Sequence, residues 1–248
     1  MASFTPTVSA PRPAASRGNR GGLPPALGGG DDGRSDHGLP DDRSRLRRAR
    51  LGLLVALTPV LMLFVAFTSA YIVRQGLPTF DPRTNTVVHD WIAIPLPTGL
   101  FLINTFVLFL SSVTMECARR EMARQVALEP LRSIPGISLG AESRFPWLAV
   151  TIVLGLCFLT GQWLAWNRLA ARGFYLATNP SSSFVYLLTA AHAAHLLLGI
   201  FALLAAAAAV MLRRPLTSRR IVVDITAWYW HFMALLWIYI LALMEFAH

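Results

Sequence analysis

The stretch LGLLVALTPVLMLFVAFTSAYIV, residues 51–73, is almost wholly apolar and contains no charged side chain. At about 1.5 Å per residue, a helix of this length covers the roughly 30 Å of a bilayer's hydrocarbon core. Because lipid offers the backbone no hydrogen-bond partners, such a segment is predicted to be helical. Four more long apolar segments, at about 95–117, 146–167, 183–212 and 222–246, predict an all-α fold, a multi-pass transmembrane bundle of five spans.

The composition agrees with a membrane protein. Hydrophobic residues make up 54% of the 248 and charged residues only 14%, whereas soluble domains carry about 25% charged residues. The net charge is +9, and all 22 basic residues are arginines. These arginines flank the predicted spans, so we interpret them as orientation signals and predict no nucleic-acid partner. Cys117 and Cys157 lack CxxC spacing, so neither a disulfide framework nor a zinc site is predicted.

The first 50 residues differ from the rest because they are rich in proline, glycine and arginine. A segment of this composition buries too little apolar surface to order itself, so residues 1–50 are predicted to be a disordered cytoplasmic tail. They lack the apolar core of a signal peptide. Residues 51–248 form the predicted transmembrane domain.

The distribution of arginines predicts the orientation of the bundle. Eighteen lie in the tail, in residues 118–145 and in residues 213–221, which share one side of the membrane because they alternate with the other loops. The loops on the opposite side hold four. Cytoplasmic segments carry the excess of basic residues. The N-terminus is therefore predicted to be cytoplasmic and the C-terminus outside.

A stripe of small and polar groups marks the fourth span. In TAAHAAHLLLG, residues 189–199, Thr189, His192, His195 and Gly199 follow one another at helical spacing. Stripes of this kind face another helix, where close approach and interhelical hydrogen bonds hold membrane bundles together. The last span contains a third intramembrane histidine, His231, among aromatic residues. We expect these imidazoles to join helices.

Two alternatives of another class remain open. A b-type cytochrome would use His192 or His195 together with His231 as axial ligands, since neutral imidazoles bind haem iron well. A stand-alone transporter is the other, although ion-coupled carriers keep ionisable residues at mid-membrane. Metal sites need three or four ligands, and no acidic residue lies deep in a predicted span, since Glu116, Asp224 and Glu245 all lie near span ends. We therefore predict no catalytic, cofactor-binding or metal-binding residue on this chain.

The motifs resemble those of subunit III of the haem–copper oxidases. LTAAHAAHLLLG resembles the stretch Thr-Gly-x-His-Gly-x-His-Val-x-x-Gly of that family, and AWYWHFMALLWIYI resembles its Tyr-Trp-His-Phe-x-Asp-x-x-Trp. PLPTGLFLINTFVLFLSSVTM matches at Asn104 and Thr105, and TIVLGLCFLTGQ matches at Gln162. The resemblance covers all five spans, about residues 51–248, in the family's order. It is closest to the five-helix bacterial form.

The resemblance implies a non-redox accessory subunit of an aerobic respiratory terminal oxidase, similar to cytochrome c oxidase. Such a subunit would pack on subunit I, with subunits I and II and membrane phospholipids as partners, and would stabilise the proton-pumping core. Haems and copper would belong to the partner subunits, and this chain would bind none. The implied location is a bacterial plasma membrane. A quinol oxidase and a nitric oxide reductase are alternative complexes.

The chain departs from the family's pattern at three positions. Pro59, Ala165 and Ala234 stand where the family has carboxylates within the membrane. A proton relay through those positions is therefore not expected here. The residues expected to join helices or line a lipid cleft, called the predicted contact set below, are His192, His195, His231, Gln162, Asn104, Thr105, Gly199 and Trp230.

Overall fold

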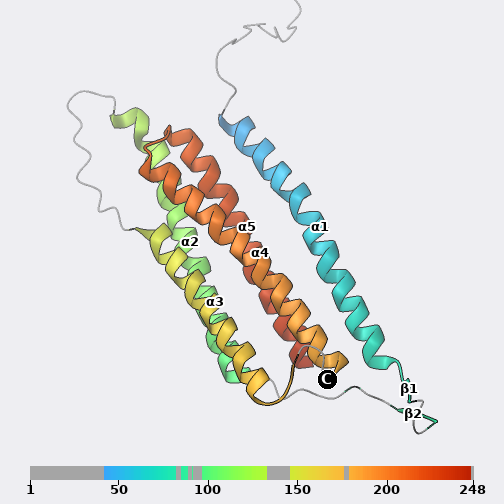
Figure 1. Ribbon diagram of the computed structural model, residues 1–248. Helices are drawn as coiled ribbons and strands as arrows, with labels where there is room; N and C mark the ends of the chain where they lie inside the picture. Colours follow the sequence, from blue (N-terminus) through green and yellow to red (C-terminus); the bar gives the residue numbers. More distant parts are fainter. Residues whose placement is uncertain are drawn as a thin grey trace, which may run out of the picture. The chain divides into compact units, whose positions relative to one another are not determined.

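A computed structural model describes residues 42–81, 85–88, 91, 97–132, 146–175 and 179–246. Within these residues the helices are α1 (Asp42–Gly76), α2 (Thr98–Arg132), α3 (Trp147–Ala171), α4 (Pro180–Met211) and α5 (Leu216–Phe246). A short antiparallel hairpin of β1 (Thr79–Asp81) and β2 (Thr86–Val88) follows α1. All five helices are long and apolar enough to cross a membrane, which confirms the predicted helical bundle (Figure 1).

α1 and α2 extend furthest beyond their predicted spans. Residues 42–50, assigned above to the tail, form the first turns of α1. Arginine, leucine and alanine favour helix, and this segment contains neither proline nor glycine to interrupt it. α2 likewise continues past residue 117 to Arg132, through a segment rich in alanine, arginine, glutamate and leucine, with Pro130 only in its last turn. An apolar run predicts which part of a helix lies in lipid, but it does not predict where the helix begins and ends. The rest of the predicted tail, residues 1–41, lies outside the described residues.

Local signals end α3 and start α4. Gly173 follows α3 with a φ of +85°, and its N–H donates to the carbonyl of Ala170 at 2.9 Å. A glycine adopts this left-handed conformation without steric cost, so it caps the helix. At the start of α4, Asn179 N–H donates to Ser182 Oγ at 3.2 Å, and Pro180 occupies the first turn. These caps bring α3 and α4 together as antiparallel neighbours.

The helices α4 and α5 lie between α1 and the pair α2–α3 (Figure 1). α5 packs on α1, α2 and α4, while α4 also packs on α1 and α3. The largest buried side chains follow this arrangement: Trp230 and Trp237 come from α5, and Phe64, Phe101 and Phe158 come from α1, α2 and α3. The core of the bundle is therefore built around one face of α5.

Large apolar side chains cover the outside of the bundle. Val55 and Met62 of α1 are 73% and 66% exposed, and Ile103 of α2 and Phe201 of α4 are 63% and 64% exposed. Exposed apolar surface on this scale needs a lipid or protein neighbour. The described helices thus form a bundle whose outer face suits hydrocarbon, as the composition predicted.

Two glycines let the indole of Trp230 pack between α3 and α4. A Cβ atom added at Gly155 of α3 would lie 2.8 Å from Trp230 Cη2. A Cβ atom added at Gly199 of α4 would lie 3.2 Å from Trp230 Cε3. Small residues allow this close approach of helices in a membrane. Gly199 belongs to the polar stripe noted in the sequence, and both glycines make room for Trp230.

Replacing Gly155 by alanine should destabilise the bundle, because the new methyl group would displace the Trp230 indole. Overpacking of this kind costs about 1–3 kcal/mol. The measurement is the free energy of unfolding of the full chain in detergent micelles. Gly52→Ala is the matched control: its Cβ meets nothing within 4 Å, so the helix should gain about 0.5–1 kcal/mol. Equal stability of the two variants would contradict this packing.

Candidate functional site

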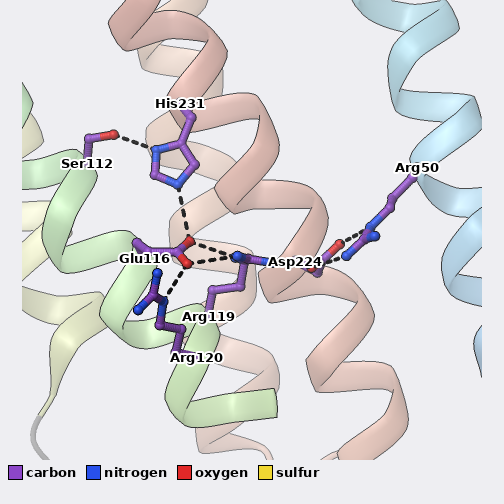
Figure 2. A network of polar contacts seen from close by, with 7 residues as sticks. All are labelled: Arg50, Ser112, Glu116, Arg119, Arg120, Asp224 and His231. Atoms are coloured by element: carbon purple, nitrogen blue, oxygen red, sulfur yellow. Dashed lines mark hydrogen bonds and ion pairs between the residues drawn. The ribbon is translucent and has the colours of Figure 1, made fainter.

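A cluster of charged side chains joins α1, α2 and α5 (Figure 2). Its centre on α5 is Asp224, which is 5% exposed. Arg50 of α1 binds this carboxylate with two nitrogens, Nε at 2.7 Å and Nη2 at 2.8 Å. Arg119 of α2 lies 3.4 Å from the same carboxylate, and the Arg50 guanidinium lies 5.8 Å from the centre of the Trp228 ring. A carboxylate bound by two nitrogens of one arginine, as in Arg50–Asp224, is among the stronger polar contacts in proteins.

The second carboxylate of the cluster is Glu116 of α2. Its oxygens accept hydrogen bonds from Arg119 Nε at 2.7 Å and Nη2 at 2.8 Å, and from Arg120 Nε at 2.7 Å. His231 of α5 points its Nε2 toward Glu116 Oε2 at 3.6 Å, and its Nδ1 lies 2.5 Å from Ser112 Oγ. Both carboxylates are therefore held by arginines. The cluster is suited to fixing helices in place, and neither acid is left unpaired to act as a base.

The sequence patterns described above do not predict this cluster. They indicate orientation signals for the arginines and positions near span ends for Glu116 and Asp224. The spacing of Glu116 to Arg119 and Arg120, three and four residues along a helix, was a usable signal for a local ion pair. No feature of the sequence pairs Arg50 with Asp224, because 174 residues separate them.

Polar groups of α2 accept hydrogen bonds from the indole N–H groups of α5. Trp237 Nε1 donates to Thr105 Oγ1 at 2.9 Å, and Trp230 Nε1 donates to Ser111 Oγ at 3.0 Å. Asn104, which is buried, donates from Nδ2 to the carbonyl of Phe158 on α3 at 3.2 Å. Asn104, Thr105 and Trp230 of the predicted contact set therefore each lie between α2 and a neighbouring helix.

The stripe of α4 faces several partners. Thr189 accepts a hydrogen bond from Trp166 Nε1 of α3 at 3.1 Å. The backbone carbonyl of His195 accepts from Tyr229 Oη of α5 at 2.8 Å. The His195 ring itself lies beside Phe64 of α1, with 5.8 Å between ring centres, and its Nδ1 is 2.7 Å from the carbonyl of Ala191. The His195 ring is therefore bonded within its own helix and packs on α1, while its backbone carbonyl links α4 to α5.

His192 and Gln162 behave differently from the expectation that they hydrogen-bond across helices. Neither side chain has a hydrogen-bond partner in the described part of the chain. The buried His192 ring lies between Phe158 and Trp237, with ring centres 5.9 and 5.2 Å away. Aromatic contacts therefore surround this imidazole, because α3 and α5 present rings at its level.

The three intramembrane histidines face three different neighbours. His192 packs on rings of α3 and α5, His195 packs on α1, and His231 reaches α2. The three rings therefore contact three different sets of side chains. Among the described residues, no group of three or more His, Cys, Asp or Glu side chains is close enough to hold a metal ion.

The three positions without the family's carboxylates are filled by neutral side chains in the structure. Ala165 of α3 is 0% exposed and Ala234 of α5 is 8% exposed. Pro59 lies within α1, which continues through it to Gly76. Asp224, a buried acid of the described bundle, lies instead in the charged cluster.

A groove runs along α2 and α5 beside His231. Two adjoining hollows of about 300 and 270 Å³ share Phe109, Ser112 and His231 in their walls. Arg120 borders the first hollow and Leu235 the second. The groove therefore has a charged end near the cluster and an apolar continuation along the bundle.

The pair Arg50–Asp224 should contribute measurably to the attachment of α1. Arg50→Ala and Asp224→Ala should each lower the free energy of unfolding, and their effects should not add, because both remove one contact. A coupling of about 0.5–3 kcal/mol is expected. Arg48→Ala, an exposed arginine of the same helical region, is the matched control and should couple to Asp224 weakly. Additive losses for Arg50 and Asp224 would mean that the contact is not formed.

Known proteins are similar in sequence to this chain over most of its length. The profile of the family described as cytochrome c oxidase subunit III matches residues 43–247. The chain is 26% identical over 194 residues to cytochrome c oxidase subunit 3 of Branchiostoma lanceolatum, a match that covers 77% of this chain and 66% of that protein. The chain therefore spans slightly less than two thirds of that relative's length.

Bacterial relatives are covered more fully. Cytochrome c oxidase subunit 3 of Corynebacterium diphtheriae is 26% identical over 212 residues, with 83% of this chain and 93% of that protein covered. Quinol oxidase subunit 3 of Bacillus spizizenii is 30% identical over 192 residues, with 77% and 82% covered. The profile match includes nearly all of the five helices described above. The chain therefore belongs to the cytochrome c oxidase subunit III family, whose members are accessory subunits of haem–copper oxidases.

Proposed function

We propose that this chain is the non-redox accessory subunit of an aerobic respiratory terminal oxidase in a bacterial plasma membrane. The observation that carries the proposal is the family match over residues 43–247, which spans the whole helical bundle. In this role the chain packs on the catalytic subunit I, and haems and copper are held by subunits I and II. Its contribution is to keep the proton-pumping core active during turnover.

The surface of the bundle supports a role as a packing subunit. Among the described helices, α1 packs on α4 and α5 and not on α2 or α3. Its Val55 and Met62 face outward together with other large apolar side chains. A partner helix would bury such side chains as well as lipid does. The inner polar groups, in contrast, are mostly engaged within the chain. A catalytic subunit would therefore meet an apolar surface.

The charged cluster supports the proposed orientation. It joins the first half of α1, the second half of α2 and the first half of α5, so these arginine-rich helix ends lie together. By the excess of arginines, this end is the cytoplasmic one. The N-terminus is then inside and the C-terminus outside. The cluster lies where phospholipid headgroups and water begin to screen charge.

The groove beside His231 is where we place a phospholipid. Arg120, whose side chain is 78% exposed, borders the charged end of the groove and suits a headgroup phosphate. Phe109 and Leu235 line the hollows and suit an acyl chain. His231 lies between these two regions. A lipid in this groove would fill space between α2, α5 and a neighbouring subunit.

Purification of the tagged full chain from its native membrane tests the proposal. The complex should contain a larger catalytic subunit, show haem absorbance and reduce oxygen. An unrelated multi-span membrane protein with the same tag is the control and should carry none of these. An oxidase assembled without the chain should keep its haem spectrum but lose activity faster during turnover. Recovery of the chain with no oxidase or reductase core would contradict the proposal.

The electron donor separates the two candidate complexes. The Bacillus spizizenii relative is named as a quinol oxidase subunit, which favours keeping that alternative beside cytochrome c oxidase. The purified complex can be supplied with either reduced cytochrome c or a quinol. Oxygen consumption with only one of the two electron donors assigns the complex. The accessory chain itself is expected to contact neither donor, so the purified complex is needed for this assay.

A further inference from the structure

Gln162 of α3 and His192 of α4 are buried polar side chains with no hydrogen-bond partner. Their exposed fractions are 1% and 0%. Four atoms are involved, Nε2 and Oε1 of Gln162 and Nδ1 and Nε2 of His192, and none has a partner in the described part of the chain. Buried polar groups in proteins nearly always bond to protein or to ordered water. Two such residues on neighbouring helices therefore need a common explanation.

The register of α3 against α4 brings the two side chains to the same place. Phe158, one turn before Gln162, packs on the His192 ring at 5.9 Å between ring centres. Trp166, one turn after Gln162, donates its Nε1 proton to Thr189 at 3.1 Å. Residues four apart on a helix lie on one face. Gln162 therefore faces α4 between the levels of Thr189 and His192.

The four polar atoms define what can bind between them. The Gln162 amide supplies two donor hydrogens and one acceptor oxygen. A neutral imidazole supplies one donor and one acceptor nitrogen. A ligand that satisfies both side chains must donate and accept hydrogen bonds at once. Water does both and is small enough for a closely packed helix interface.

Other ligands fit the surroundings less well. A carboxylate would favour a cation, but Asp224 and Glu116 are bound to arginines in the charged cluster. An apolar molecule would leave all four polar atoms unpaired. The site is also closed, since Leu188 and Leu196 of α4 and Ala165 of α3 are almost wholly buried around it. A molecule held here would exchange slowly with the surroundings.

We propose that Gln162 and His192 form a binding site for an internal water molecule that ties α3 to α4. The water accepts a hydrogen bond from Gln162 Nε2 and donates one to the unprotonated nitrogen of His192, so it satisfies one of the two polar atoms of each side chain. This water-mediated contact continues the row of interhelical bonds that includes Trp166 to Thr189. The imidazole of His192 thus serves the packing of the bundle through a bound solvent molecule.

Solid-state NMR of the full chain in lipid bilayers tests the site directly. Magnetisation transfer from water protons should reach the side-chain amide of Gln162. The matched control is the side-chain amide of Asn104, which is equally buried but donates to the carbonyl of Phe158, so it should receive no transfer. No transfer to Gln162, or the same transfer to both amides, would overturn the proposal.

Apolar variants supply a second test that does not depend on assigned spectra. Gln162→Met and His192→Phe should each lower the thermal unfolding midpoint, because each leaves the other partner and the water incompletely bonded. The double variant should regain part of that loss, since it removes the whole polar site. Thr160→Val, at an exposed position of α3, should change the midpoint little. Losses that simply add in the double variant would overturn a shared site.

Discussion

Lipid offers no hydrogen bonds, and this constraint determines how the described bundle uses its polar groups. The hydroxyl of Thr68 donates to the carbonyl one turn before it at 2.8 Å, as does that of Thr105 at 2.7 Å. Thr105 then accepts the indole proton of Trp237 at 2.9 Å. One small side chain thus satisfies its own helix and a neighbouring one. Many polar side chains of the described bundle bond to their own helix or to a neighbouring one, because lipid provides no alternative partner.

The same constraint explains why the charged residues gather at one end. An ion in hydrocarbon is costly unless it is paired, and Asp224 is paired with Arg50 at 2.7 Å near the arginine-rich helix ends. This contact gives α1 a specific attachment to α5, while apolar packing alone would leave its position less well defined. Membership of the subunit III family fits this design, since an accessory subunit needs a fixed shape more than a reactive group. The arginines have two roles, as orientation signals and as partners of buried acids.

Apolar length predicted the five spans, because the bilayer fixes how long an uncharged helix must be. The polar helix ends at residues 42–50 and beyond residue 117 gave no such signal, so the domain boundary at residue 50 was placed too late. Helical spacing correctly indicated that Thr189 and His192 face inward, but spacing alone does not reveal which helix each side chain meets. The divergence of His195 and His231 toward α1 and α2 depends on contacts between distant segments. A single sequence does not contain that information.

The central claim is that the buried imidazoles of this chain stabilise helix packing and that electron transfer belongs to companion subunits. The three histidines face different helices, and the described residues contain no cluster of ligands for a metal ion. Metal analysis and visible absorption of the chain purified away from its partners test this claim most directly. The account predicts a colourless protein without stoichiometric iron or copper. A haem spectrum that disappears in the His231→Ala variant would contradict it.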